Sequence, residues 1–196
     1  MFTGIIETLA EVVATRKDGG NLVITMQTPL AAELKIDQSV AHNGVCLTVT
    51  NIEGNTYEIV AVAETLQKTN LGQLTPTQFV NLERAMVFNG RIDGHLVQGH
   101  VDSVGECISS QEQNGSWLYR FRYPAEFAAL IVEKGSICMN GISLTVFDVT
   151  NDEFSVAIIP YTYEFTNVSK IKPGHLVNLE FDVLGKYVAR QMAVRN

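Results

Sequence analysis

The sequence NGVCLTV at residues 43–49 occurs a second time, with small changes, as NGISLTV at residues 140–146. The two copies begin 97 positions apart (140 minus 43), which is close to half of the 196-residue chain. The same spacing relates VNLE at residues 80–83 to VNLE at residues 177–180. A repeat that keeps one register over this length indicates two copies of one whole domain rather than a short solenoid unit.

Both halves contain short runs of β-branched and apolar residues separated by turn residues. This pattern, without alternating long helices, predicts an all-β protein with about six antiparallel strands per half, closed into a small barrel. The predicted strands cover residues 9–16, 21–27, 46–52, 56–62 and 79–84 in the first half, and 104–109, 117–122, 143–149, 154–159 and 175–181 in the second.

Helices are predicted to be short, at residues 29–34, 64–71, 123–127 and 162–168. The tail, residues 184–194, follows the last repeated segment and has helix formers with apolar residues on one face. The apolar face of this helix is expected either to pack on its own domain or to contact another subunit. The predicted domains are therefore residues 1–94, residues 95–184 and a terminal helix at residues 185–196.

Composition limits the class of protein. Apolar residues make up 46% of the chain, as in soluble globular proteins. The net charge of −7 argues against nucleic acid or an anionic membrane as the main partner. No basic stretch precedes an apolar run at the N-terminus, and three cysteines are too few for a disulfide framework. These features indicate a reduced, cytoplasmic protein.

Both copies need the same residue types in order to fold in the same way. Positions at which the two copies differ are therefore candidates for a functional role. Cys46 in the first copy corresponds to Ser143 in the second. A lone cysteine is usually an inert core residue, but a second nucleophile at the matching position favours a functional role. Thr48 and Thr145 lie two residues further on, so each strand presents a small polar pair on one face.

Two histidines, His95 and His100, lie in the segment GHLVQGH. Their spacing of five places them on opposite faces of a strand, which makes a shared metal ion an unfavourable interpretation. One could bond across the junction between the domains, and the other could transfer protons at a pocket mouth. His42 and His175 have no supporting context, and Lys134 is either a turn residue or a ligand-binding group. Phosphate loops, dinucleotide fingerprints and hydrolase motifs are not found in the sequence.

Four segments together resemble the riboflavin synthases of the lumazine-binding repeat family, and the resemblance extends over the whole chain. They are MFTGIIE at residues 1–7, HNGVCLTV at 42–49, GHLVQGHVD at 94–102 and GISLT at 141–145. The resemblance implies two six-stranded Greek-key barrels and a C-terminal helix, assembled as a homotrimer. It also implies a reaction in which two molecules of 6,7-dimethyl-8-ribityllumazine give riboflavin and 5-amino-6-ribitylaminouracil, without a metal or a redox cofactor. It allows an association with a lumazine synthase.

Matching the family motifs residue by residue gives two expected pockets, one on each barrel, for two substrate molecules. The first would use Gly4, Ile5, Ile6, Cys46, Leu47, Thr48, Val60, Ala61, Val62, Ala63, Glu64 and Thr65. The second would use Gly99, His100, Val101, Lys134, Ser143, Leu144, Thr145, Ala157, Ile158, Ile159, Pro160, Tyr161 and Thr162. The expected catalytic residues are His100, Cys46, Ser143, Thr48 and Thr145.

At two positions the sequence departs from the family pattern, because Tyr161 and Tyr163 stand where many members carry a His or Glu and a Leu. This leaves the role of the Tyr161 side chain undetermined. The main alternative is a non-catalytic protein that binds lumazine or flavin, since such proteins resemble the synthases. The retention of both NGxxLTV segments and both histidines favours the enzyme. A flavin-binding barrel of a reductase would need a nucleotide-binding domain for which the chain has no room.

Overall fold

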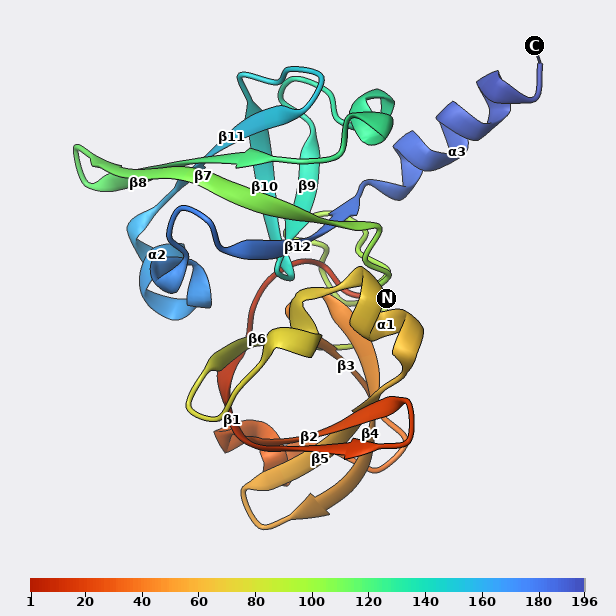
Figure 1. Cartoon of the computed structure of the whole chain (residues 1–196), viewed down its shortest axis with the longest axis vertical. Helices are drawn as coiled ribbons and strands as arrows, with labels where there is room; N and C mark the ends of the chain where they lie inside the picture. The colour runs from red at the N-terminus through yellow and green to blue at the C-terminus, as the bar shows by residue number, and fades with distance from the viewer. Residues whose placement is uncertain (196) are drawn as a thin grey trace.

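The computed structural model describes residues 1–195, which form two closed six-stranded barrels stacked end to end (Figure 1). The first barrel contains β1 (Thr8–Asp18), β2 (Asn21–Gln27), β3 (Ser39–His42), β4 (Val45–Glu53), β5 (Thr56–Ala61) and β6 (Phe79–Arg84). The second contains β7 (Ser103–Gln113), β8 (Ser116–Arg122), β9 (Ser136–Met139), β10 (Ile142–Phe147), β11 (Glu153–Ile158) and β12 (Leu176–Phe181).

The helical segments are short, apart from one at the C-terminus. They are η1 (Pro29–Glu33), α1 (Ala63–Lys68), η2 (Asn70–Gln73), η3 (Ala125–Leu130), α2 (Pro160–Phe165), η4 (Asn167–Lys170) and α3 (Val183–Ala193). Helix α3 projects away from the second barrel into open space (Figure 1) and has no buried residue. In the described residues, no helix is long and apolar enough to cross a bilayer.

The strand order confirms the predicted all-β duplication. The first barrel closes in the order β1-β2-β5-β4-β3-β6, and the second follows the same order when β7 to β12 replace β1 to β6. All neighbouring strands are antiparallel. The ten predicted strands are present, and the sequence analysis missed β3 and β9. Each of these has only four residues and is largely buried, so it shows no alternation of polar and apolar residues.

Each barrel encloses its own core, made by the inward-facing residues of alternating strands. Ile24, Tyr57 and Leu82 are among the buried residues of the first core. Phe121 and Phe154 stack at 5.7 Å in the second. His42 also lies inside the first barrel, with its Nε2 atom 2.9 Å from the Tyr57 hydroxyl. Burial lowers the pKa of His42 to about 4.

The two Asn-Gly turns of the repeated segment meet where the barrels abut. Asn43, Gly44, Asn140 and Gly141 all have positive φ, as the tight turn of a two-residue hairpin requires. A Cβ atom on Gly44 would lie 2.8 Å from the Gly141 backbone nitrogen. The glycines therefore permit the close approach of the two backbones, and the approximate twofold axis of the molecule passes between them.

A cluster of buried asparagines surrounds this contact and joins the barrels. Asn43 Oδ1 accepts a hydrogen bond from Asn167 Nδ2 at 2.8 Å, and Asn140 Oδ1 accepts one from Asn70 Nδ2 at 3.2 Å. These bonds are reciprocal, since each joins a turn of one barrel to the segment before the last strand of the other. Three asparagines from each copy take part: Asn43, Asn70 and Asn81, and Asn140, Asn167 and Asn178.

Candidate active sites

In the first barrel, the ladder between β4 and β5 ends before the strands do. Their pairing stops at Val49 and Ile59, whereas the register would place Thr48 opposite Val60. On this side of the ladder, facing backbone N–H and C=O groups lack strand partners. Cys46, Thr48 and Val60 point outward here, since the residues between them are buried. The result is an open strand edge flanked by small side chains.

The second barrel has an equivalent open edge between β10 and β11. These strands pair only at Val146–Val156 and Phe147–Ser155. Ser143, Thr145 and Ala157 project from the unpaired part. A flat molecule with alternating donors and acceptors can bind such an edge as a further strand would.

Two extended segments, called here the first strap (residues 2–6) and the second strap (residues 97–101), cross between the barrels. They pair with each other through Phe2 and Val97. The carbonyl of Gly4 accepts a hydrogen bond from the Ser143 N–H at 2.8 Å. The carbonyl of Gly99 accepts one from the Cys46 N–H at 2.9 Å. Each strap therefore lies on the open edge of the barrel that does not follow it in the sequence.

This crossing corrects the expected grouping of the pockets. Gly4, Ile5 and Ile6 were assigned to the pocket of Cys46, but Gly4 contacts Ser143 and Ile6 packs against the second core. Gly99, His100 and Val101 were grouped with Ser143, but Gly99 contacts Cys46 of the first barrel instead. Val101 packs against the first core. Matching the two repeats shows which segments are equivalent, but it does not show which barrel each segment contacts.

Two buried glutamates hold the straps, and the sequence analysis assigned them no role. Glu83 accepts hydrogen bonds from the Thr3 N–H at 2.6 Å and the Gly4 N–H at 3.0 Å. Glu180, its counterpart, accepts from the backbone N–H groups of Gln98 and His100. Burial raises the pKa of both carboxyl groups. The signal was present in the sequence as the repeated VNLE, which ends in a charged residue at a core strand.

A histidine distinguishes the second site from the first. His95 Nδ1 lies 2.7 Å from Ser143 Oγ, and the His95 N–H donates to the Thr3 carbonyl at 3.1 Å. Burial lowers the pKa of His95, which favours the neutral imidazole. His100, the expected base, has an exposed side chain on the second strap, beside the Cys46 site.

Some expected binding residues point into the barrels. Leu47, Ala61 and Ile158 are at most 8% exposed and belong to the cores. Leu144 is half-buried against the second core. The side chains of the three buried residues are therefore unavailable to a ligand, and only their backbone groups can contribute.

The residues after the open edges form the rim of each site. In the first site, Val62 and Ala63 are exposed, and Glu64 is paired with Lys68 at 2.9 Å. The second rim is aromatic, since Tyr161 packs against Phe165 with ring centroids 4.6 Å apart and the ring planes tilted by 36°.

The remaining rim residues are exposed to a similar degree at matching positions of the two copies. Ile159, Pro160 and Tyr161 are exposed, and Thr65 and Thr162 are half-buried at matching positions. Lys134 lies 4.9 Å from the Phe147 ring centroid, on the strand face that carries Thr145. In residues 1–195, no group of three or more His, Cys, Asp or Glu side chains has a metal-binding arrangement.

Comparisons with known proteins agree with the duplication. The lumazine binding domain family matches twice, at residues 3–85 and 98–182. Riboflavin synthase of Actinobacillus pleuropneumoniae is 43% identical over 189 residues, covering 96% of this chain and 88% of the relative. Riboflavin synthase of Mycobacterium bovis is 42% identical over 197 residues, covering 98% of each chain.

Solved structures support the fold. LumP complexed with riboflavin superposes with a TM-score of 0.87 at 20% identity, covering 92% of this chain and 99% of LumP. LumP complexed with 6,7-dimethyl-8-(1'-D-ribityl) lumazine gives a TM-score of 0.85 at 19% identity. With two matching domains and full-length relatives above 30% identity, the chain belongs to the lumazine-binding family of riboflavin synthases.

Proposed function

We propose that the chain converts two molecules of 6,7-dimethyl-8-ribityllumazine into riboflavin and 5-amino-6-(D-ribitylamino)uracil. The observation that carries this proposal is the pair of equivalent open strand edges, at Cys46–Thr48 and Ser143–Thr145, each bordered by a strap at its first residue. Two like molecules need two like sites, and a reaction between them needs the sites to differ. The Cys46 site and the Ser143–His95 site meet both requirements.

The reaction is a dismutation, so the two products contain all the atoms of the two substrates. One lumazine loses a proton from its C7 methyl group, and the ring delocalises the resulting carbanion. The carbanion attacks the second lumazine, and a four-carbon unit passes from one ring to the other. The proposed base is His100 or a water molecule. Cys46 and Ser143 are the candidates for activating the electrophilic carbon, with Thr48 and Thr145 binding the ring edges.

Placement is the main contribution of the protein in this account, because the ring itself stabilises the carbanion. Holding two reactants in a productive geometry is worth up to roughly 7–11 kcal/mol in the best intramolecular cases. The unpaired backbone groups of the open edges are suited to this task, since they are fixed by the barrel on either side.

A homotrimer is the proposed assembly. Helix α3 leaves Leu184, Val188 and Met192 more than half exposed at spacings of four, with Tyr187 beside them. A projecting helix with an apolar stripe of this kind is stabilised by packing against copies of itself. In the trimer, the Cys46 site of one chain would face the Ser143 site of a neighbour.

The proposal is tested by blocking one edge at a time. Thr48→Trp and Thr145→Trp each place a large ring on one open edge, and Thr50→Trp, at the exposed β-bulge of β4 beyond that edge, is the control. We expect riboflavin formation, followed by absorbance, to fall at least a hundredfold in the first two variants and to persist in the third. Full turnover in either blocked variant would exclude that edge as a substrate site. Wild-type protein that returns lumazine unchanged would be a binding protein instead.

A further inference from the structure

Each strap is followed directly by an acidic residue that is fixed to the last strand of a barrel. Glu7 follows the first strap and Asp102 follows the second, at a spacing of 95 (102 minus 7). Glu7 accepts a hydrogen bond from the Arg84 N–H at 2.6 Å, and Asp102 accepts one from the Phe181 N–H at 2.9 Å. The backbone contact is therefore the same in both copies.

The charged partner of this acidic residue differs between the copies. In the first copy, the Arg84 guanidinium also pairs with Glu7, with Nη2 2.6 Å from Oε2. The second copy has Phe181 at the position of Arg84, 97 residues further on, and so has no charge there. Lys186 of α3 pairs with the acidic residue instead, with its Nζ atom 2.5 Å from Asp102 Oδ2. The end of the second strap is thus held by a helix that belongs to neither repeat.

Lys186 faces the second strap rather than open solvent. It is two residues from Leu184 and from Val188, which is about 200° around a helix, so it lies opposite the apolar stripe of α3. Its side chain is 25% exposed, and that of Asp102 is 22% exposed. Charges that are partly withdrawn from water are screened less than charges at the surface, so this pair is stronger than an ordinary surface salt bridge.

The charge of Lys186 also acts on Glu180, the other carboxylate that holds the second strap. Glu180 accepts hydrogen bonds from the backbone N–H groups of Gln98 and His100. Burial raises the pKa of Glu180, and the positive charge of Lys186 acts against this rise. Lys186 therefore favours the ionised form of the carboxyl group to which the strap is bonded.

The second strap in turn covers one side of Cys46. The Gly99 carbonyl accepts a hydrogen bond from the Cys46 N–H at 2.9 Å, and Val97 belongs to the apolar cluster against which Cys46 packs. Two residues separate Gly99 from Asp102, so the chain has little length in which to absorb a shift at Asp102. A displacement of Asp102 is therefore passed on to the backbone that contacts Cys46.

We propose that Lys186 is a positioning residue for the Cys46 site. It holds Asp102, Asp102 fixes the end of the second strap, and the strap holds Gly99 against Cys46. Lys186 acts through the strap and is not a catalytic residue. Its effect on turnover rests on the proposed synthase function, whereas its effect on the position of the strap does not.

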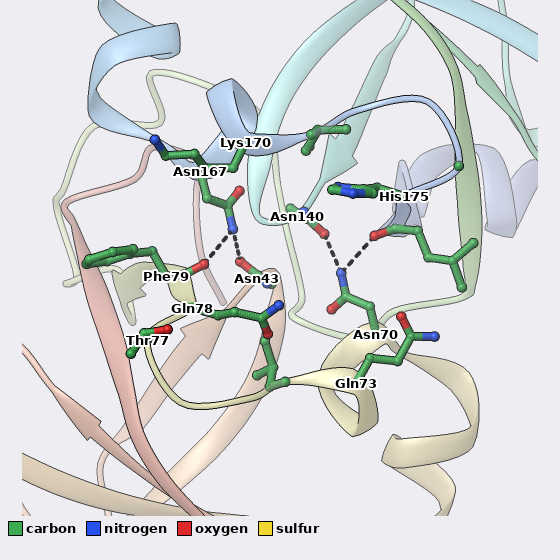
Figure 2. A pocket seen from close by; sticks show the side chains of 14 residues that line it. Asn43, Asn70, Gln73, Thr77, Gln78, Phe79, Asn140, Asn167, Lys170 and His175 are labelled. Atoms are coloured by element: carbon green, nitrogen blue, oxygen red, sulfur yellow. Dashed lines mark hydrogen bonds between the residues drawn. The ribbon is translucent and has the colours of Figure 1, made fainter.

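The relative orientation of the barrels does not depend on this ion pair. Figure 2 shows the asparagine contacts that join the barrels, between Asn43 and Asn167 and between Asn70 and Asn140, and these involve no residue of α3. Removal of the Lys186 charge should therefore release the end of the second strap while both barrels stay in place.

The test is the rate at which iodoacetamide alkylates Cys46 in the full-length protein, followed by mass spectrometry of the labelled peptide. Cys46 is half-buried, whereas Cys107 and Cys138 are buried, and burial raises the pKa of both buried thiols. Since the thiolate is the reactive form, labelling of the folded protein reports on Cys46. This readout measures the cover provided by the strap and needs no turnover.

Lys186→Met removes the charge and keeps a side chain of similar length. We expect it to raise the alkylation rate about tenfold, because the strap opens more often. We expect kcat for riboflavin formation to fall about tenfold, because the site is displaced. The far-UV circular dichroism should not change. Lys186→Arg keeps the charge and should restore both rates.

Arg190→Met is the matched control, since it removes an exposed charge one turn further along α3 and should leave both rates unchanged. Asp102→Asn breaks the same ion pair, so the double variant with Lys186→Met should alkylate no faster than either single variant.

Wild-type alkylation in Lys186→Met, equal acceleration in Arg190→Met, or additive effects in the double variant would each overturn the proposal. If wild-type protein forms no riboflavin, the proposed function fails, and the alkylation rates still decide the role of Lys186.

Discussion

At the scale of single residues, the two sites differ most at Ser143 and its neighbour His95. His95 Nδ1 and Ser143 Oγ are 2.7 Å apart, and within residues 1–195 no histidine forms an equivalent contact with Cys46. A positioned acid or base typically contributes about 10²–10⁴ in rate. Ser143→Ala should lower kcat about a hundredfold while the free energy of unfolding changes little, as measured by steady-state kinetics and urea denaturation. Ser110→Ala on β7 is the control, and unchanged kcat in Ser143→Ala would remove this residue from the mechanism.

His42 allows a prediction about pH. Its pKa is about 4 in the folded protein, because it is buried, compared with an ordinary value of 6.5. Between these values the unfolded chain binds a proton at His42 and the folded chain does not, so stability falls as the pH falls. The loss from pH 7 to pH 5 should be about 2 kcal/mol from this group.

His42→Gln removes the titration and can keep a polar contact with Tyr57. The free energy of unfolding from urea titration should therefore fall less steeply in the variant than in the wild type over this interval. Parallel curves would mean that His42 is not held neutral by the fold.

The sequence could identify candidate functional residues at positions where the two copies of the repeat carry different residues. The exchange of Cys46 for Ser143 is visible in the sequence, as is the small polar pair formed with each threonine. The His95–Ser143 contact was not predictable, because 48 residues separate the two side chains and no pattern records contacts at that distance. Glu83 and Glu180 were visible as a repeat, but their burial was not.

At the scale of elements, the straps determine the geometry of both sites. Gly99 has φ +81°, and a Cβ atom there would lie 2.5 Å from Cys46 Cβ. Gly115 has φ +83° with nothing within 4 Å, so it carries the same backbone strain without the clash. Gly99→Ala should therefore cost about 1–3 kcal/mol more than Gly115→Ala in urea denaturation. It should also abolish most riboflavin formation, because the second strap must move away from Cys46.

Equal losses of stability in the two alanine variants would show that only the positive φ matters at Gly99. The path of the strap over the β4 edge would then not depend on the close contact with Cys46.

The strands that alternate clearly in sequence were predicted close to their observed bounds, as for residues 21–27 and 79–84. The prediction failed for β3 and β9, which are short and buried. It also failed for the crossing of the straps. Whether a segment stays on its own barrel or crosses to the other depends on long-range hydrogen bonds, such as those to Glu83 and Glu180.

At the scale of the whole molecule, the duplicated barrels are joined by reciprocal asparagine contacts. A cluster in which all but one of the buried amide oxygens are hydrogen-bonded favours one relative orientation of the barrels, since any other leaves more buried amides unpaired. The relative orientation of the two barrels determines where the two straps cross. One strap therefore lies beside each open edge. The first two residues of each Asn-Gly segment thus join the barrels, and Cys46 or Ser143 further along the segment belongs to a candidate site.

Assembly through α3 is a prediction at this scale. Val188→Asp and Met192→Asp place charge on the apolar stripe and should convert the protein to monomers in sedimentation velocity, with unchanged far-UV circular dichroism. Turnover should fall with the oligomer if neighbouring chains share a reaction. Arg190→Asp, on the opposite side of the helix, is the control. A stable trimer in both stripe variants would exclude α3 as the main contact.

The central claim is that the two open edges hold two lumazine molecules that react with each other. The most direct measurement is the product ratio when purified wild-type protein is incubated with 6,7-dimethyl-8-ribityllumazine as the sole added compound. The account predicts one riboflavin and one 5-amino-6-(D-ribitylamino)uracil for every two lumazines consumed. A protein that binds lumazine and releases it unchanged, or that needs an added reagent to form riboflavin, would contradict it.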